Sequence, residues 1–406
     1  MEIRKFRLEY CDLPTMVENV DFMLRLVYVR INKSNNRPIN ISAIILWTVS
    51  LTCYYYAYVF SMVWFVLVRC PETGDLLAAC VVFSLVVCSQ PSFLTMFHMI
   101  VYKKRVQSLI DNCLMLNELV KPGTVYSKNL HTHLRYIKKR ATVVFITMVM
   151  NGILYVLMPI VLPGRHLTED YQVIYGLEPM LETPNFEIAS VMMALSVYIC
   201  VFSMANITAF NLIILGYIEA QMVALSREIQ SVWKNAEEFC KQRDHPHVPS
   251  HGLKHELQNM FVNETLKEII CFHIKCIEII KEYNSVFRVT KAIEFTVIIL
   301  AIISELLGGI ENTYLEIPFT FVLISMECVA GQKLTDASSN FERAVYSCKW
   351  ENFNVKNRRI ILSMLPIAQR MLSISAGGMA VLNYSCMLSV AKFSYSTYNT
   401  LRLMVK

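Results

Sequence analysis

The chain has 406 residues, of which 55% are hydrophobic and only 17% are charged, and its formal net charge is +6. That proportion is too apolar for one or two soluble domains. A positive charge can indicate a nucleic-acid partner, but these basic residues stand beside long apolar runs rather than on one soluble face. We therefore expect an integral protein of the lipid bilayer that binds no nucleic acid.

Apolar runs long enough to cross a hydrocarbon core of about 30 Å recur along the chain. The first begins only near Ile41, so we expect it to insert without a cleaved signal peptide. The fifth and sixth runs are short, with Glu305 and Glu327 near their ends. The sequence predicts an all-α integral membrane protein with seven transmembrane helices: Ile41–Val68, Leu76–Val101, Ala141–Val161, Ile188–Ile218, Ala292–Leu307, Pro318–Ala330 and Met379–Val405.

Lysine and arginine predict the orientation of these helices, because cytoplasmic segments next to spans carry an excess of both. With the N-terminus cytoplasmic, 33 of the 38 basic residues fall in cytoplasmic segments and 4 fall outside. An odd number of spans then makes the C-terminus extracellular. This topology is the inverse of that of a G-protein-coupled receptor.

A long charged stretch, residues 219–291, separates the fourth and fifth spans and contains His245, His247, His251 and His255. Two prolines and a glycine interrupt these histidines, so we predict no metal site. The sequence has no Walker loop, dinucleotide fingerprint, nucleophile elbow or zincin helix. We accordingly expect neither an enzyme with catalytic residues nor a cofactor.

The seventh span is unusually polar, with Asn383, Lys392 and Asn399 among many serines and threonines. Unpaired polar groups are costly in lipid, so this helix must face protein or water. Two interpretations remain open: a central helix that is hydrogen-bonded to its neighbours, or a helix that lines an ion pathway. In the second case the pore-lining stripe, at four-residue spacing, is Ser396, Thr400 and Met404.

The outer halves of the second, third, fourth and sixth spans combine aromatic, methionine and aliphatic residues with a few hydroxyls and amides. Such walls suit a small volatile ligand, although ordinary helix packing is the alternative for any single residue. We place no unpaired charge there and expect no strongly charged ligand. The candidate ligand-binding residues are Phe83, Ser84, Val87, Asn151, Tyr155, Met192, Met193, Ser196, Phe319, Leu323 and Met326.

Motifs in about the last 75 residues resemble the insect odorant receptor family. They are Gly-Gln-Lys-Leu-Thr-Asp-Ala-Ser at 331–338, Ala-Val-Tyr-Ser-Cys-Lys-Trp at 344–350, Arg-Arg at 358–359, Ala-Gly-Gly at 376–378 and Lys-Phe-Ser-Tyr-Ser at 392–396. The chain is similar to the ligand-tuned branch, because the shared co-receptor has an expanded loop after the fourth span. The resemblance implies an odorant-binding subunit of a heteromeric, ligand-gated, non-selective cation channel, a tetramer with the co-receptor in the plasma membrane of olfactory sensory neurons.

The resemblance also implies three regions. Residues 1–330 would form six transmembrane helices with an odorant pocket in the outer half, residues 331–378 a cytoplasmic anchor between subunits, and residues 379–406 the pore helix. The packing points of the anchor would be Tyr346, Trp350, Gly377 and Gly378. Thr400 stands where a co-receptor gate would have a bulkier apolar residue.

Three alternatives accompany this hypothesis. A gustatory receptor usually ends with Thr-Tyr, five residues and Gln-Phe, whereas here Met404 and Val405 occupy the last pair. A metabotropic receptor coupled to a G protein would need an extracellular N-terminus. A secondary transporter would show repeated halves with broken helices in matching positions, which the sequence lacks.

Overall fold

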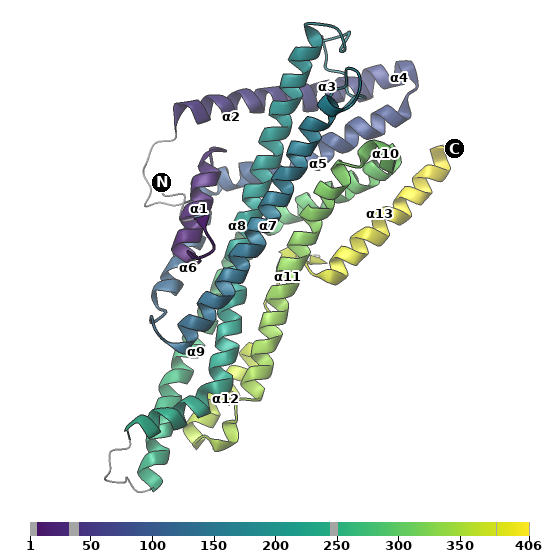
Figure 1. Ribbon diagram of the computed structural model, residues 1–406. Helices are drawn as coiled ribbons and strands as arrows, with labels where there is room; N and C mark the ends of the chain where they lie inside the picture. The colour runs from purple at the N-terminus through teal and green to yellow at the C-terminus, as the bar shows by residue number, and fades with distance from the viewer. Residues whose placement is uncertain (1–5, 32–39, 244–250, 379, 406) are drawn as a thin grey trace.

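The fold is that of a long helical bundle, seen in a computed structural model that describes residues 6–31, 40–243, 251–378 and 380–405 (Figure 1). Helix α8 lies at its centre and packs against α1, α2, α5, α7, α9 and α11. The helices are α1 (Leu13–Arg25), α2 (Ile41–Tyr54), α3 (Ser61–Trp64), α4 (Cys70–Thr73), α5 (Leu76–Val101), α6 (Lys103–Glu118), α7 (Val125–Val161), α8 (Asn185–Arg243), α9 (His251–Gly308), α10 (Ile310–Thr313), α11 (Glu316–Tyr346), α12 (Val355–Ala368) and α13 (Tyr384–Val405). Two π-helical turns, η2 (Tyr55–Phe60) and η3 (Phe65–Arg69), join α2, α3 and α4, and the 3-10 turn η4 (Trp350–Asn352) precedes α12.

Short polar side chains start several of these helices by accepting a hydrogen bond from a free backbone N–H of the first turn. Asp12 caps α1, Asp75 caps α5, Thr124 caps α7 and Asn354 caps α12. Between α4 and α5, Gly74 adopts φ 73°, a left-handed conformation that glycine takes without strain. The very short turn between the first two spans is therefore encoded locally.

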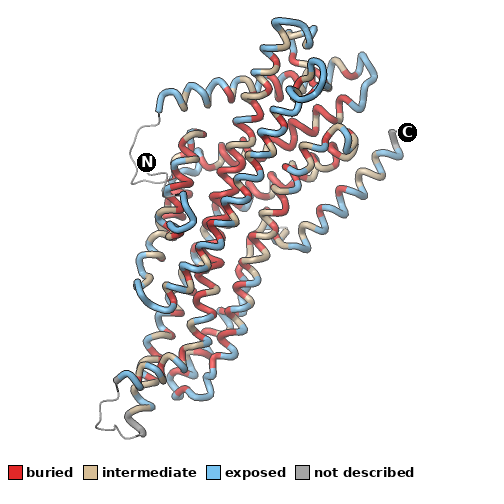
Figure 2. Tube along the Cα trace, viewed as in Figure 1, coloured by how far each residue is buried: buried red, intermediate tan, exposed pale blue. Residues whose placement is uncertain are grey.

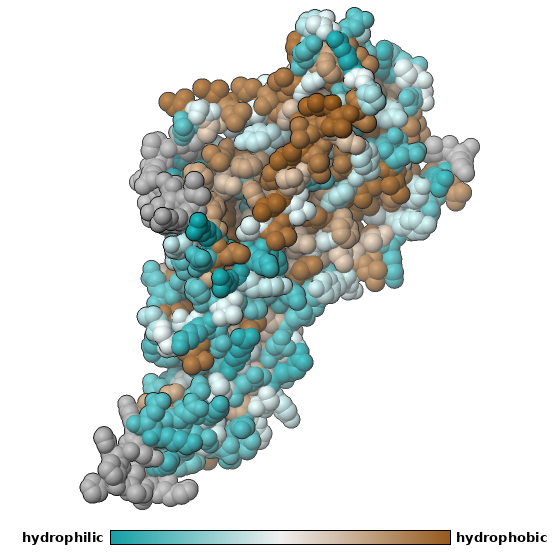
Figure 3. All heavy atoms as spheres, in the orientation of Figure 1, coloured by the Kyte–Doolittle hydropathy of each residue, from teal (hydrophilic) through white to brown (hydrophobic). Residues whose placement is uncertain are grey.

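The molecule divides into an apolar outer part and a polar inner extension. Figure 3 shows hydrophobic side chains gathered over the upper part and hydrophilic ones over the lower end. Helices α8 and α9, of 59 and 58 residues, run through both parts. At 1.5 Å per residue each is roughly 90 Å long, about three times the thickness of a hydrocarbon core. The charged stretch 219–291 is thus mostly the helical continuation of two transmembrane segments.

All seven expected spans coincide with helices of this bundle. Five of the described helical segments are long and apolar enough to cross a membrane on their own: Ile41–Thr73, Leu76–Val101, Val125–Val161, Asn185–Gln242 and Glu316–Asn352. The fifth expected span is the last part of α9, and the sixth is the first part of α11. Helices α9 and α13 fall below that apolarity because of their polar residues.

A small antiparallel hairpin precedes the last helix, where the sequence predicted a helix from Met379. Strands β1 (Ser375–Ala376) and β2 (Ala380–Val381) pair with Ala376 opposite Ala380. Residue 379 itself is outside the described residues, and α13 begins only at Tyr384. Gly377 and Gly378 form the turn at φ 65° and 79°, conformations that explain why two glycines stand there. The expected start of the seventh span was therefore too early.

The hairpin is held closely by α9 and α11. The Gly377 N–H donates to the Arg288 carbonyl oxygen of α9 at 2.9 Å. On α11, a Cβ added to Gly331 would lie 2.0 Å from the carbonyl oxygen of Leu382, just before α13. Only glycine lets α11 approach the chain so closely at this point.

Candidate functional site

A cavity of about 50 Å³ lies among α2, η2, α5, α7, α8 and the start of α11, in the outer part of the bundle. Its wall is mainly aromatic and aliphatic. The lining residues are Tyr54, Tyr58, Leu85, Cys88, Ser89, Asn151, Gly152, Tyr155, Ser196, Val197, Cys200, Val201, Leu315, Glu316 and Phe319. We call this the outer cavity.

Close helix packing and hydrogen bonds fix the wall of the outer cavity. Gly152 lets α7 approach α8, since a Cβ there would lie 2.9 Å from Val201. The Tyr54 hydroxyl lies 2.6 Å from the Ser89 hydroxyl, and its ring stacks on Phe93 with centroids 4.0 Å apart. Such a wall is largely formed before any ligand arrives.

Some polar groups of the outer cavity have hydrogen-bond partners within the protein, and others have none among the described residues. Asn151 Nδ2 donates to the Leu315 carbonyl at 3.2 Å, and the Ser196 hydroxyl donates to the Met192 carbonyl at 2.7 Å. The Glu316 carboxylate accepts a hydrogen bond from Ser84 at 2.8 Å on Oε2. Within the described residues, Glu316 Oε1 and the Tyr58 hydroxyl have no hydrogen-bond partner although both are buried.

The candidate ligand-binding residues are only partly gathered at this cavity. Asn151, Tyr155, Ser196 and Phe319 line it. The others lie around it. Ser84 is hydrogen-bonded to Glu316, and Phe83 and Val87 pack near Ala301. Three more belong to the hydrophobic core between the helices, namely Met192, Met193 and Leu323, and Met326 lines a second cavity nearer the cytoplasmic side, the inner cavity. Whether any of them contacts a ligand stays a prediction.

The expectation of a pocket without charge is wrong. Glu316 lies in the wall, two residues before the predicted start of the sixth span, because α11 begins at Glu316 rather than at Pro318. Sequence reasoning also missed Tyr54 and Tyr58, which come from the first span. The run of tyrosines there was visible, but nothing in it indicated which rings turn inward.

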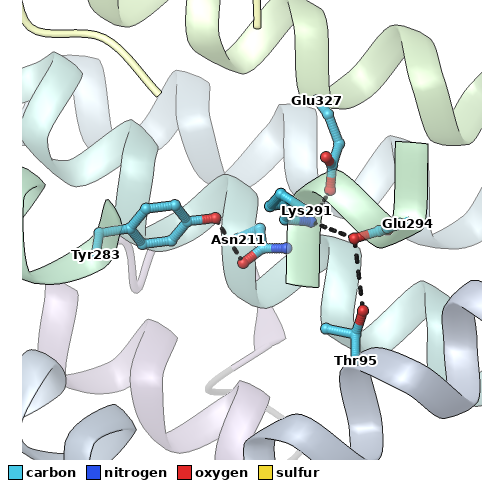
Figure 4. A network of polar contacts seen from close by, with 6 residues as sticks. All are labelled: Thr95, Asn211, Tyr283, Lys291, Glu294 and Glu327. Atoms are coloured by element: carbon cyan, nitrogen blue, oxygen red, sulfur yellow. Dashed lines mark hydrogen bonds and ion pairs between the residues drawn. The ribbon is translucent and has the colours of Figure 1, made fainter. Parts of the chain in front are cut away.

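A buried ionic network lies at the inner cavity (Figure 4). Lys291 Nζ contacts Glu294 of the same helix at 2.9 Å and also Glu327 of α11. The Thr95 hydroxyl of α5 donates to Glu294 at 3.5 Å, and beside it the Tyr283 hydroxyl donates to Asn211 at 3.1 Å. The ionic and hydrogen-bond contacts of this inner network join α5, α9 and α11, and the Tyr283–Asn211 bond joins α9 to α8. Glu294 Oε1 and Glu327 Oε2 have no hydrogen-bond partner among the described residues.

The predicted pore residues lie on a free face of the last helix. Figure 1 shows α13 diverging from the bundle, and Figure 2 shows that much of it is exposed. Ser396 and Thr400 are exposed, and the Thr400 hydroxyl donates to the Ser396 carbonyl at 3.1 Å. The side chain of Met404 is outside the described residues.

The predicted anchor residues are also accessible in the single chain. Tyr346 is 71% exposed and Trp350 is 42% exposed, and the Trp350 indole donates to the Tyr346 carbonyl at 3.1 Å. Gly377 and Gly378 lie in the hairpin turn beside Arg288. Of the histidines in the inner extension, His245 and His247 are outside the described residues.

Cys88 and Glu316 of the cavity wall come together with Glu305. One potential ligand atom of each lies within 4.8 Å of the other two, and all three side chains are buried. The Glu305 carboxylate accepts a hydrogen bond from Thr320 at 2.5 Å. Two carboxyl groups thus share a small volume of the transmembrane core.

Known proteins resemble this chain in sequence and in fold. A family model described as "7tm Odorant receptor" matches residues 75–395. Odorant receptor 85b of Drosophila melanogaster is 24% identical over 161 residues, 37% of this chain and 41% of that protein. Odorant receptor 10a of the same organism is 21% identical over 205 residues, 48% of each chain. The aligned parts span less than half the length of these relatives.

Solved structures of the insect olfactory receptor OR5 from Machilis hrabei share the fold. One has a TM-score of 0.73 at 14% identity, covering 96% of this chain and 98% of that one. Another, in complex with eugenol, has a TM-score of 0.72 at 15% identity and covers 97% and 99%. The predicted fold class, an all-α membrane protein with seven transmembrane helices, is confirmed. Because the family model matches well over half of its length, the chain belongs to the insect odorant receptor family.

Proposed function

We propose that this chain is the odorant-binding, ligand-tuned subunit of a heteromeric ligand-gated cation channel, assembled with an odorant co-receptor in the plasma membrane of olfactory sensory neurons. The observation that carries the proposal is the outer cavity, which is apolar, buried and largely formed in advance. A small volatile molecule gains affinity there by burying its apolar surface against aromatic rings. The polar groups in the wall would then discriminate between ligands that carry different polar functional groups.

The cavity has a direct structural route to the last helix. Helix α11 begins in the cavity wall, with Leu315 as its N-cap and with Glu316 and Phe319 in its first turn. The same helix continues to Gly331, which touches the chain at Leu382 immediately before α13. A ligand that favours one position of α11 would therefore favour one position of α13.

The exposed face of α13 supports a pore-lining role for residues 379–406. Serine and threonine hydroxyls that face neither lipid nor their own bundle suit a water-filled passage between subunits. Exposed Tyr346 and Trp350 likewise support an anchoring role for residues 331–378, since large aromatic side chains are frequent at protein interfaces. Residues 1–330 would then hold the ligand.

The test is to express the chain with an odorant co-receptor in cultured cells and to record currents over a broad odorant panel. Tyr155→Ala removes an aromatic wall of the cavity and should raise the half-maximal concentration of the best ligand about tenfold. Thr400→Ala should leave that concentration unchanged and alter ion permeation instead.

A matched control is Tyr198→Ala, because Tyr198 is on α8 but is 37% exposed and does not line the cavity. Its ligand response should equal that of the wild type. The absence of current over the whole panel, despite surface expression of both subunits, would contradict the proposal. Equal losses in all three variants would contradict the site assignment alone.

A further inference from the structure

The outer cavity contains a carboxylate for which the described residues supply no counter-charge. Glu316 is 3% exposed and lines the cavity, and its Oε1 is unpartnered within the described part of the chain. Its other oxygen receives only the neutral Ser84 hydroxyl. An ionised carboxylate removed from water is costly unless a charged or hydrogen-bonding partner meets it. The cavity thus has a ready position for a cation.

The transmembrane core does not provide that cation itself. The sequence has no lysine or arginine in residues 76–101, 141–161, 188–218 or 292–330. Lys291, at the inner end of the fifth span, already contacts Glu294 and Glu327. Glu305 lies near Glu316 and adds a second carboxyl rather than a counter-charge. Because the two carboxyls lie so close together, repulsion keeps at least one of them protonated, and a bound cation would favour the ionised form of the other.

The rest of the wall suits an organic cation better than a bare metal ion. Tyr54, Tyr58, Tyr155 and Phe319 present aromatic rings, whose faces attract alkylammonium groups. The aliphatic remainder, including Leu85 and Val197, would contact an alkyl chain. The free Tyr58 hydroxyl can accept one N–H while Glu316 Oε1 accepts another.

We propose that the outer cavity binds a small alkylammonium ion, a volatile amine in its protonated form, with its nitrogen between Glu316 and Tyr58 and its alkyl chain among the aromatic rings. This inference rests on the proposed function, because it names the ligand class of the same cavity. A neutral alcohol of equal length fills the same volume but brings no charge. The amine is therefore preferred over its isosteric alcohol.

Binding to the purified full-length chain tests the proposal without any channel current. The thermal stability of the wild type is titrated with hexylamine and with 1-hexanol at neutral pH. Hexylamine should stabilise at concentrations at least tenfold lower than hexanol. In Glu316→Gln, which keeps the shape and removes the charge, the amine should lose at least tenfold in apparent affinity and the alcohol should be unaffected.

The matched control is Glu311→Gln, because Glu311 is an exposed carboxylate on the neighbouring α10 and does not line the cavity. It should bind hexylamine like the wild type. Equal affinity for amine and alcohol in the wild type overturns the proposal, even if Glu316→Gln does not fold. Stabilisation by zinc ions that requires Cys88 and Glu316, with no effect of amines, also overturns it in favour of a metal site.

Currents with the co-receptor separate this inference from the proposed function. If neutral odorants open the channel and amines do not, the function stands and the amine proposal fails. If amines bind through Glu316 but no ligand of the panel evokes a current, the amine proposal stands and the channel function fails.

Discussion

The outer cavity and the inner network are two buried carboxylate clusters in one bundle, and they are built in opposite ways. In the inner network Lys291 contacts both Glu294 and Glu327, so the protein itself supplies one cation to the two carboxyl groups. In the outer cavity Glu316 and Glu305 lie together and the sequence places no lysine or arginine in the surrounding spans. A carboxyl cluster that contains its own cation is held together by that cation, whereas a cluster without one could receive a cation from a ligand.

The largest expected effect comes from removing the cation of the inner network. Lys291→Met leaves Glu294 and Glu327 buried without their partner, and breaking a buried pair in this way costs about 3–5 kcal/mol. We expect a strong loss of folded protein at the cell surface and a lower midpoint of thermal unfolding. By contrast, Glu316→Gln should not lower stability, because no ionic partner is lost and a buried carboxyl group without a counter-charge is removed.

Lys281→Met is the control, since Lys281 is exposed on the same helix. Adding Glu294→Gln and Glu327→Gln to Lys291→Met should recover part of the lost stability. If the triple variant is no better than Lys291→Met alone, the loss came from packing of the lysine stem rather than from unbalanced charge.

Features that depend on composition could be predicted from the sequence, whereas features that depend on contacts between distant residues could not. Apolar runs and basic flanks were sufficient for the seven helices and their orientation. The helical extensions of α8 and α9 were not visible, because a charged amphipathic segment has no hydropathy signal and is stabilised by its neighbours. The role of Glu316 was also hidden, since only packing of α11 against α5 brings it to Ser84. Asn151, Tyr155, Ser196 and Phe319, which were predicted from side-chain type in the outer halves of the spans, do line the outer cavity.

A smaller effect, up to about 3 kcal/mol, is expected where the outer cavity is linked to the last helix. In Gly331→Ala the new Cβ would collide with the Leu382 backbone carbonyl and push the hairpin away from α11. Ligand binding measured by thermal stabilisation should persist, while the current per bound receptor should fall. Gly216→Ala is the matched control, because there the new Cβ would collide with the buried Ile137 side chain between α8 and α7, away from the hairpin. Equal effects of both variants would indicate general loosening of the bundle instead of a link.

The smallest effect concerns His273, a buried basic residue of the inner extension that has no carboxylate partner in the described part of the chain. His273 is 2% exposed and its ring contacts that of Phe341, with centroids 4.5 Å apart and planes tilted by 49°. Its Nε2 has no partner among the described residues. Burial lowers the pKa of His273 from 6.5 to about 4. The unfolded chain therefore takes up this proton near pH 6.5 and the folded chain only near pH 4, so stability is complete above pH 6.5 and decreases as the pH falls.

At pH 5 this difference should amount to about 2 kcal/mol relative to pH 7. His273→Leu should abolish that part of the acid loss, which unfolding of the purified chain measured between pH 7 and pH 5 would reveal. His166→Leu, in an exposed loop where the histidine pairs with Asp170 at 2.8 Å, should retain it. An unchanged acid loss in His273→Leu would mean that another group carries it. Its disappearance would show that burial of the charged imidazole at this one position causes the loss of stability at low pH.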